Sequence, residues 1–301
     1  MFGVDWRLCQ MPDRAAHPGG QQYKNLFNQM ATLNEWGRSS ASAIFRVLFQ
    51  RYQPKSILDV GCGVGIWMSV AREMGVEIVR GVDGPWLDPS QLVVERELVT
   101  VADLEQPLNL GTRFDLAICL ETAEHLKASA AETLVESLVR HAPAVLFSAA
   151  VPYQRGPGHV NEQWPNYWCE RFARHRYGAL DFIRSSVWYD EKVLWWYRQN
   201  VLLFVNSDLC RSRPRLHREG EIQKLRLQPA SVVLPDLFVT VARRLLDLEQ
   251  ALLKGGDYVL EVDEHGSVYL TAGDGLTGNG ARPHMTASVP RKRAGSAWNV
   301  R

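Results

Sequence analysis

The chain has 301 residues, a length that suits one large domain with an appendage or two modest domains. Hydrophobic residues make up 46% of it, charged residues 22%, and the formal net charge is +1, which is an ordinary globular composition. A charge balance so close to neutral argues against nucleic acid or an anionic membrane as the main partner.

The cysteines and the first residues indicate where the protein works. The five cysteines are scattered and form no CxxC pair or metal-ligand spacing, which is typical of a reducing compartment. The first twenty residues lack the basic stretch and apolar run of a secretory signal. No segment offers the ~20 apolar residues that a membrane helix needs. We therefore expect a cytoplasmic protein without membrane insertion.

Short apolar runs alternate with helical patterns in the first half of the chain. Residues 1–30 are rich in Gln, Asn, Gly and Pro, and we interpret them as a loosely structured lead-in. Apolar residues at helical spacing then predict a helix over 34–52, which Pro54 cannot continue. The predicted strands cover 56–60, 77–82, 98–102, 114–120 and 144–149, and the clearest helices between them cover 66–74 and 129–141. Strands that are apolar on both faces indicate an α/β fold with a doubly wound, Rossmann-like, mostly parallel sheet and helices on both faces.

The pattern changes after residue 151 to a polar, aromatic loop. Helices are predicted around 164–175 and 192–197, with strands near 180–185 and at 201–206 that complete a seven-stranded sheet.

Three regions complete the predicted domain organisation. The main domain covers 31–207. Residues 208–254 are interpreted as a basic linker and a helix over 237–253, which suits packing on the core, pairing with a second subunit or docking on a partner. Gly, Asp, Thr and Arg dominate 255–301, which we interpret as a disordered tail.

A glycine-rich loop follows the first predicted strand, and it consists of Asp59, Gly61, Cys62, Gly63 and Gly65. Glycines allow a tight turn that brings backbone amides to a ligand, and the helix that follows adds its positive dipole end. A sharp turn without a ligand is the alternative. A dinucleotide site requires GxGxxG, but Ile66 stands where the third glycine belongs. The absence of a following Lys-Ser or Lys-Thr pair argues against a P-loop.

The run ILDVGCGVG resembles motif I of the class I S-adenosylmethionine (SAM) dependent methyltransferases. The resemblance makes the loop from Asp59 to Gly65 part of a SAM site. It implies that Asp83, followed by Gly84 in GVDG, binds both ribose hydroxyls, since two carboxylate oxygens suit a vicinal diol. It also implies that Asp103 and Leu104, in VADLEQPL, contact the adenine.

The segment FDLAICLETAEHL resembles the fourth strand of this family and the loop that closes over the methionine part of SAM. Leu120 and Glu121 are therefore further cofactor-binding candidates. Glu121, Glu124 and His125 offer ligand types that suit a metal ion. Adjacent charged residues at a helix start are usually solvated, however, so no metal is expected here.

The loop after the fifth strand reads VPYQRGPGHVNEQWPNYW and carries a candidate general base. Histidine is a common general base, so His159 is the candidate, and Glu162, three residues later, would orient or polarise it. The alternative is a helix-entry histidine that bonds to the backbone. His125 is the second candidate base.

The runs HVNEQWPxYW and WWYxQN resemble bacterial small-molecule methyltransferases of the type 11 and type 23 groups that are associated with sugars and glycans. The resemblance covers residues 35–207 and implies a hydroxyl or amine of a small molecule or glycan as methyl acceptor. The tryptophans of these runs suit either stacking on a sugar or the protein core. A protein or RNA methyltransferase, or a catalytically silent protein that binds SAM or a partner, are the alternatives. A DNA amino-methyltransferase is disfavoured, because CLETAEHL replaces its Pro-Pro-aromatic motif.

Overall fold

The computed structural model describes residues 20–156, 158–225, 231–235, 237–239, 241–242, 258–262, 267–272 and 286–288. The chain divides into two compact units, Met1–Leu234 and Pro235–Arg301.

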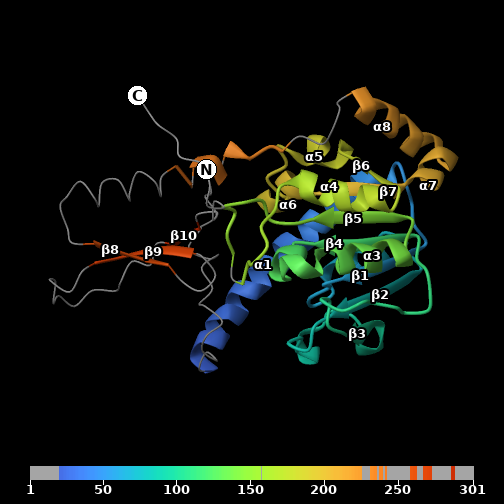
Figure 1. Cartoon of the computed structure of the whole chain (residues 1–301). Coiled ribbons are helices and arrows are strands. Elements are labelled where there is room, and N and C mark those ends of the chain that lie inside the picture. Colours follow the sequence, from blue (N-terminus) through green and yellow to red (C-terminus); the bar gives the residue numbers. More distant parts are fainter. Residues whose placement is uncertain are drawn as a thin grey trace, which may run out of the picture. The chain divides into compact units, whose positions relative to one another are not determined.

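The first unit is built on a seven-stranded sheet with the order β3-β2-β1-β4-β5-β7-β6 (Figure 1). The strands are β1 Ser56–Val60, β2 Ile78–Asp83, β3 Val99–Val101, β4 Leu116–Leu120, β5 Ala144–Ser148, β6 Tyr177–Leu180 and β7 Leu202–Asn206. The first five pair in parallel, and β7 runs antiparallel to both β5 and β6. The predicted doubly wound, mostly parallel sheet is confirmed.

Strand β1 lies at the point where the strand order reverses. Its Ile57 pairs with Val79 of β2 on one side and with Leu116 of β4 on the other. The chain moves outward from β1 through β2 to β3 and then returns to place β4 beside β1. Ligands of open α/β sheets bind beyond the carboxyl ends of the strands at such a reversal. The fold therefore predicts a ligand site formed by the residues that follow β1, β2 and β4.

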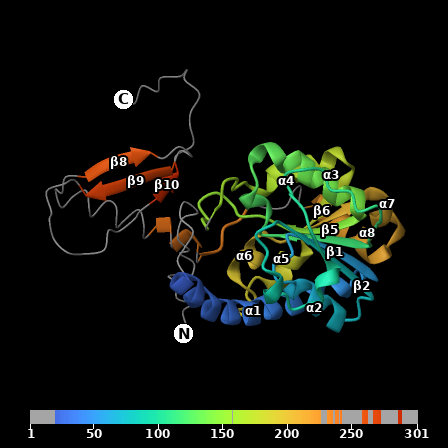
Figure 2. The ribbon, with the colours of Figure 1, turned by 90° about the horizontal axis from the view of Figure 1, so that it is seen from below.

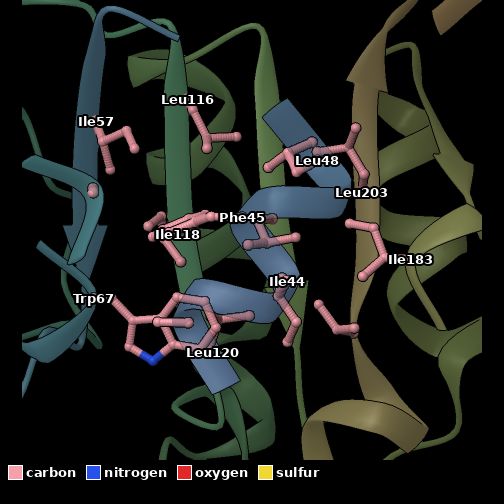
Figure 3. Close-up of a cluster of buried hydrophobic side chains, with 14 of the residues drawn as sticks. Ile44, Phe45, Leu48, Ile57, Trp67, Leu116, Ile118, Leu120, Ile183 and Leu203 are labelled. Atoms are coloured by element: carbon pink, nitrogen blue, oxygen red, sulfur yellow. The ribbon is translucent and has the colours of Figure 1, made fainter. Parts of the chain in front are cut away.

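One face of the sheet is covered by α1 (Gly20–Phe49), α2 (Ile66–Glu73) and α5 (Phe182–Val187), seen below the strands in Figure 2. Ile44 and Phe45 of α1 have no exposed surface, and Phe45 lies beside Ile118 of β4, which is equally buried (Figure 3). Helix α1 begins earlier than predicted, because Gly20 lies inside the expected lead-in of residues 1–30. No proline interrupts the sequence from 20 to 49, so the helix extends through it.

The opposite face is covered by α3 (Ala131–His141) and α4 (Pro165–Arg174). Phe172 of α4 stacks on Phe204 of β7, with ring centroids 3.9 Å apart and an interplanar angle of 14°. Phe147 of β5 meets both rings edge-on. Successive side chains of each strand point to opposite faces of the sheet. Because helices cover both faces, the strands are continuous apolar runs in the sequence.

Two predictions for the part beyond residue 175 need correction. The expected strand at 180–185 lies earlier, at β6, and α5 begins at Phe182. Phe182, Ile183 and Val187 are buried at helical spacing, and the same apolar run resembles a strand in the sequence. The expected linker after residue 207 contains two helices, α7 Ser207–Ser212 and α8 Pro214–Leu225. Asn206 caps the first through its side chain, and a proline opens the second.

The remaining elements of the first unit are short. Helix α6 (Trp195–Asn200) precedes β7, and 3₁₀ turns occupy η2 Pro89–Gln91, η3 Arg96–Leu98, η4 Ala123–His125 and η5 Ala128–Ala130. Among the described residues, no helix is both long and apolar enough to cross a membrane.

The second unit contains a three-stranded antiparallel sheet with the order β10-β9-β8. Its strands are β8 Tyr258–Val262, β9 Ser267–Ala272 and β10 Thr286–Ser288, within the tail that the sequence predicts to be disordered. Strands β8 and β9 carry aromatic and β-branched residues, which favour extended backbone. Of the helix predicted over 237–253, residues 237–239 and 241–242 are helical, and the others lie outside the described residues.

The stacked phenylalanines give a test of this core. Truncating Phe172 to alanine removes a fully buried ring from between α4 and β7, and we expect the free energy of unfolding to fall by about 3–5 kcal/mol. The matched control is Tyr189→Ala, because that ring is 89% exposed and its loss should change stability by about 0.5 kcal/mol or less. Chemical denaturation measures both, and equal effects would contradict the packing described.

Candidate active site

The glycine-rich loop between β1 and α2 adopts a left-handed backbone. Gly61, Gly63 and Gly65 have φ values of 80°, 53° and 86°. A Cβ on Gly61 would lie 2.3 Å from Thr122 Oγ1, so the loop passes directly against the segment that follows β4. A Cβ on Gly63 would meet nothing within 4 Å, which leaves open space beside that peptide. Packing therefore requires glycine at residue 61, while residue 63 leaves room for a ligand.

Cys62 of the same loop contributes its side chain to the core. Its Sγ atom would lie 2.7 Å from a Cβ on Gly81, in contact with the face that α2 covers. Burial raises the pKa of its thiol, with the charges of Asp59 and Asp83 adding to the effect. The thiol is a packing group here, although the sequence also made Cys62 a cofactor-binding candidate.

Asp83, the last residue of β2, joins the strand to the glycine loop. Its Oδ2 accepts a hydrogen bond of 2.6 Å from the amide of Gly63, and its Oδ1 accepts one of 2.7 Å from the amide of Gly84. The aromatic ring of Trp86 lies over Gly84, where a Cβ would be 2.1 Å from its Cζ2 atom. The carboxylate that the sequence selected for the ribose therefore lies beside the open glycine of the loop.

Asp59, the fourth residue of β1, lies buried beneath this carboxylate. Only 3% of the residue is exposed, and its Oδ2 has no hydrogen-bond partner among the described residues. Burial, together with the smaller effect of the neighbouring charge of Asp83, raises the pKa of Asp59 to about 8. The free protein thus holds a carboxyl group with a raised pKa and with one oxygen, Oδ2, that accepts no hydrogen bond within the described part of the chain.

Asp103 and Leu104 follow β3 and differ in their exposure to solvent. Asp103 is exposed, and its Oδ1 accepts a bond of 2.9 Å from the amide of Glu105. Leu104 is 3% exposed and packs in the core on the face of α3. The amide of Ala102 donates to the carbonyl of Asp83 at 2.9 Å, which brings this loop next to the end of β2.

Glu121 follows Leu120 at the end of β4 in a strained backbone with φ of 49°. Its amide donates to both the carbonyl and the hydroxyl of Ser148, at 3.0 and 3.1 Å, which fixes it to the end of β5. Its carboxylate accepts bonds from Gln154 Nε2 at 2.8 Å and from Asn200 Nδ2 at 3.1 Å. Desolvation raises the pKa of this carboxyl, and these hydrogen bonds oppose the shift.

Gln154 and Asn200 are the residues that reasoning from the sequence missed. Both are buried, they bond to each other at 2.8 Å, and Gln199 joins them from α6. The run WWYxQN contains two of the three amides, but nothing in its spacing connects it with Glu121, about 80 positions earlier. Only the antiparallel return of β7 beside β5 brings them together.

Glu124 lies in η4, directly after this segment, and it is fully buried. Neither of its carboxylate oxygens has a hydrogen-bond partner among the described residues. Burial raises the pKa of Glu124 well above its usual range, and the charge of Glu121 adds to the shift. The expectation that Glu121, Glu124 and His125 form a solvated helix start is therefore wrong for Glu124.

The two candidate histidines lie side by side. The rings of His125 and His159 meet edge-on with centroids 4.8 Å apart. His159 Nδ1 lies 2.9 Å from Glu162 Oε1, so the predicted histidine–carboxylate pair is present. The same carboxylate accepts the amides of Tyr153 and Arg155 at 2.8 and 2.5 Å, which fixes it in place.

The tryptophans divide between core and surface. Trp67 packs edge-on against Phe45 and Tyr197, and Trp168 is 2% exposed in the opposite core. Trp164 is 41% exposed at the start of α4.

Residues 33–185 match the family model described as a methyltransferase domain. A search of curated proteins finds no match. Among solved structures, a sugar N-methyltransferase of a Streptoalloteichus species has 16% identity and a TM-score of 0.45 over 65% of this chain and 97% of that one. Magnesium protoporphyrin IX methyltransferase of Synechocystis, solved with SAM, has 16% identity and a TM-score of 0.42 over 67% and 89%.

The family match spans about half of the chain, from within α1 to α5, and includes the glycine loop, Asp83 and the segment after β4. The sheet order and the motif order agree with it. The chain belongs to the methyltransferase-domain family and is a SAM-dependent methyltransferase of the class I fold.

Proposed function

We propose that this methyltransferase transfers the SAM methyl group to a hydroxyl or amine of a small polar molecule, such as a sugar or glycan. The observation that carries the proposal is that two groups lie at the carboxyl ends of β1, β2 and β4, where the glycine loop packs at Gly61 against Thr122 of the segment after β4. One group is the open glycine loop with its carboxylates, and the other is the pair of histidines with the amide cluster around Glu121. A cofactor in the first group faces an acceptor in the second.

Asp83 is the proposed ribose ligand. Its two oxygens accept backbone amides in the free protein, so the carboxylate is already oriented next to the open side of Gly63. A vicinal diol donates two hydrogen bonds that suit a pair of carboxylate oxygens. Asp103 and the amide of Leu104 are proposed for the adenine, because their loop lies beside the end of β2.

A polar acceptor suits the groups beyond β4 and β5. The rings of Tyr153 and Trp164 are each 41% exposed at the two ends of the loop that carries His159. Aromatic faces pack against the apolar faces of sugars, while amide groups such as Gln154 and Asn200 bind hydroxyls. These features support a sugar or glycan as the acceptor. Binding of such an acceptor would not require an oligomer or a partner docked through residues 237–253.

His159 is the proposed general base. Glu162 Oε1 accepts a hydrogen bond from the Nδ1–H group of the neutral imidazole, and this tautomer leaves the lone pair on Nε2 to take a proton from the acceptor. In the transfer step an acceptor lone pair forms the new bond to the methyl carbon while the carbon–sulfur bond breaks, and the electron pair stays on sulfur. Holding the acceptor in line supplies most of the rate, worth ~7 to 11 kcal/mol in favourable cases.

Calorimetry with SAM and S-adenosylhomocysteine, followed by an assay of S-adenosylhomocysteine release over a panel of nucleotide sugars and glycans, tests the proposal. We expect binding of both cofactors and release that depends on one class of acceptor. Binding without release on any acceptor would favour a silent SAM-binding protein. Release on proteins or RNA alone would contradict the small acceptor.

Asp83→Ala removes both acceptor oxygens from the ribose site. We expect SAM binding to weaken by about 10- to 100-fold, because hydrogen bonds to charged groups contribute ~1.5–3 kcal/mol each. Asp88→Ala is the matched control, since this carboxylate is exposed and accepts bonds from the amide and hydroxyl of Ser90. Equal SAM affinity in Asp83→Ala and in the parent would overturn the ribose assignment.

Proton release on SAM binding tests Asp59. The pKa of this buried carboxyl is about 8 in the free protein, and the positive charge of SAM lowers it in the complex. SAM affinity should therefore rise as the pH increases toward 8 and level off above it. Calorimetry in buffers of different ionisation enthalpy should count a proton released at pH 7 by the parent and less by Asp59→Asn. The same count in both proteins would exclude Asp59 as the source.

His159→Ala should lower kcat by about 10²- to 10⁴-fold and leave SAM affinity unchanged, because the ring acts on the acceptor rather than on the cofactor. His217→Ala, an exposed histidine of α8, provides the control and should keep full turnover. Steady-state kinetics and calorimetry measure the two effects. Unchanged turnover in His159→Ala would remove this residue from the mechanism.

A further inference from the structure

Three potential metal ligands from two segments meet next to the proposed acceptor site. Glu124, His125 and His159 each offer one ligand atom, and these atoms all lie within 4.8 Å of one another. The amides of Val160 and Asn161 donate to the carbonyl of Glu124 at 2.8 and 3.0 Å. These backbone bonds hold the loop of His159 against η4, so the three side chains meet in a fixed framework.

Glu124 is the observation that points to an ion. The residue has no exposed surface, and neither carboxylate oxygen accepts a hydrogen bond in the described part of the chain. Burying a carboxylate without a partner is strongly unfavourable. The nearest acidic neighbour, Glu121, adds repulsion instead of relief. A cation bound here would compensate Glu124 directly.

Both histidines have an oxygen atom facing Nδ1. Nδ1 of His159 faces Glu162 Oε1 at 2.9 Å, and Nδ1 of His125 faces the carbonyl oxygen of Gly158 at 3.3 Å. An oxygen acceptor at Nδ1 selects the tautomer with its proton there and its lone pair on Nε2. Metal-binding histidines are held by this kind of contact, to a carboxylate or a backbone carbonyl.

We propose that Glu124, His125 and His159 bind a divalent transition-metal ion. Two imidazole nitrogens and one carboxylate suit Mn²⁺, Fe²⁺ or Zn²⁺, and a set of three protein ligands leaves coordination positions open. The second cluster of this kind, Glu132, Glu136 and His175, is a poorer site. Arg174 already bonds to Glu132 at 2.7 Å, and its positive charge opposes a cation.

The open positions give the ion a role that rests on the proposed function. An acceptor hydroxyl that coordinates the ion loses its proton to solvent more readily, and its oxygen then takes the methyl group as the carbon–sulfur bond breaks. A proton and an ion compete for the same Nε2 lone pair of His159. In the metal-loaded protein His159 therefore holds the ion, and the ion replaces it in activating the acceptor.

The test uses the full chain, which is first treated with a chelator and then titrated with Mn²⁺. Electron paramagnetic resonance measures the concentration of free Mn²⁺ at each step of the titration. We expect one bound ion per chain, with binding weakened by about tenfold or more in Glu124→Gln and in His125→Ala. Glu124→Gln keeps the shape of the side chain and removes its charge. His175→Ala, from the second cluster, should bind as the parent does, and circular dichroism checks that each variant is folded.

Two results would overturn the metal site: no Mn²⁺ binding by the parent, or equal binding by the parent and a folded Glu124→Gln. Failure of the metal site can be distinguished from failure of the proposed function, because SAM binding is measured in the same samples. SAM binding without Mn²⁺ binding would reject only the metal site. Full turnover in the presence of chelator, with Mn²⁺ binding intact, would reject the role of the ion at the acceptor.

Discussion

Parallel pairing of β2, β1, β4 and β5 is the constraint on which the site depends. It brings the carboxyl ends of these strands to one edge, so residues far apart in the sequence become neighbours: Asp83 bonds to Gly63, and Glu121 bonds to Ser148. The buried aliphatic layers under α1 and α4 hold this pairing from both faces. The stability of these layers offsets the cost of strained backbone and buried polar groups in the loops at this edge.

Two buried acids with unsatisfied carboxylate oxygens flank the point where the strand order reverses. Asp59 belongs to the cofactor half of the site and Glu124 to the acceptor half, and Oδ2 of the first and both oxygens of the second accept no hydrogen bond from the described residues. A cationic cofactor beside the first and a metal ion beside the second would relieve both. The free protein would then hold unfavourable electrostatics that binding removes, which links affinity to the ionisation of these groups.

The sequence predicted the parallel half of the sheet and the methyltransferase family well, because both depend on local patterns. Apolar runs marked the strands within a few residues, and the glycine spacing marked the loop at Gly61 to Gly65. Its errors have physical causes. The burial of Glu124 and the amides around Glu121 depend on contacts across long stretches of chain, and α5 has an apolar run that resembles a strand.

The central claim is that the cofactor half and the ion site face each other across one edge of the sheet. Nuclear magnetic resonance of SAM labelled with ¹³C at its methyl group, bound to the protein with and without Mn²⁺, tests it most directly. We expect Mn²⁺ to broaden the methyl signal strongly in the parent, and we expect this broadening to be lost in Glu124→Gln. An unbroadened methyl signal in a parent protein that binds both SAM and Mn²⁺ would contradict the account.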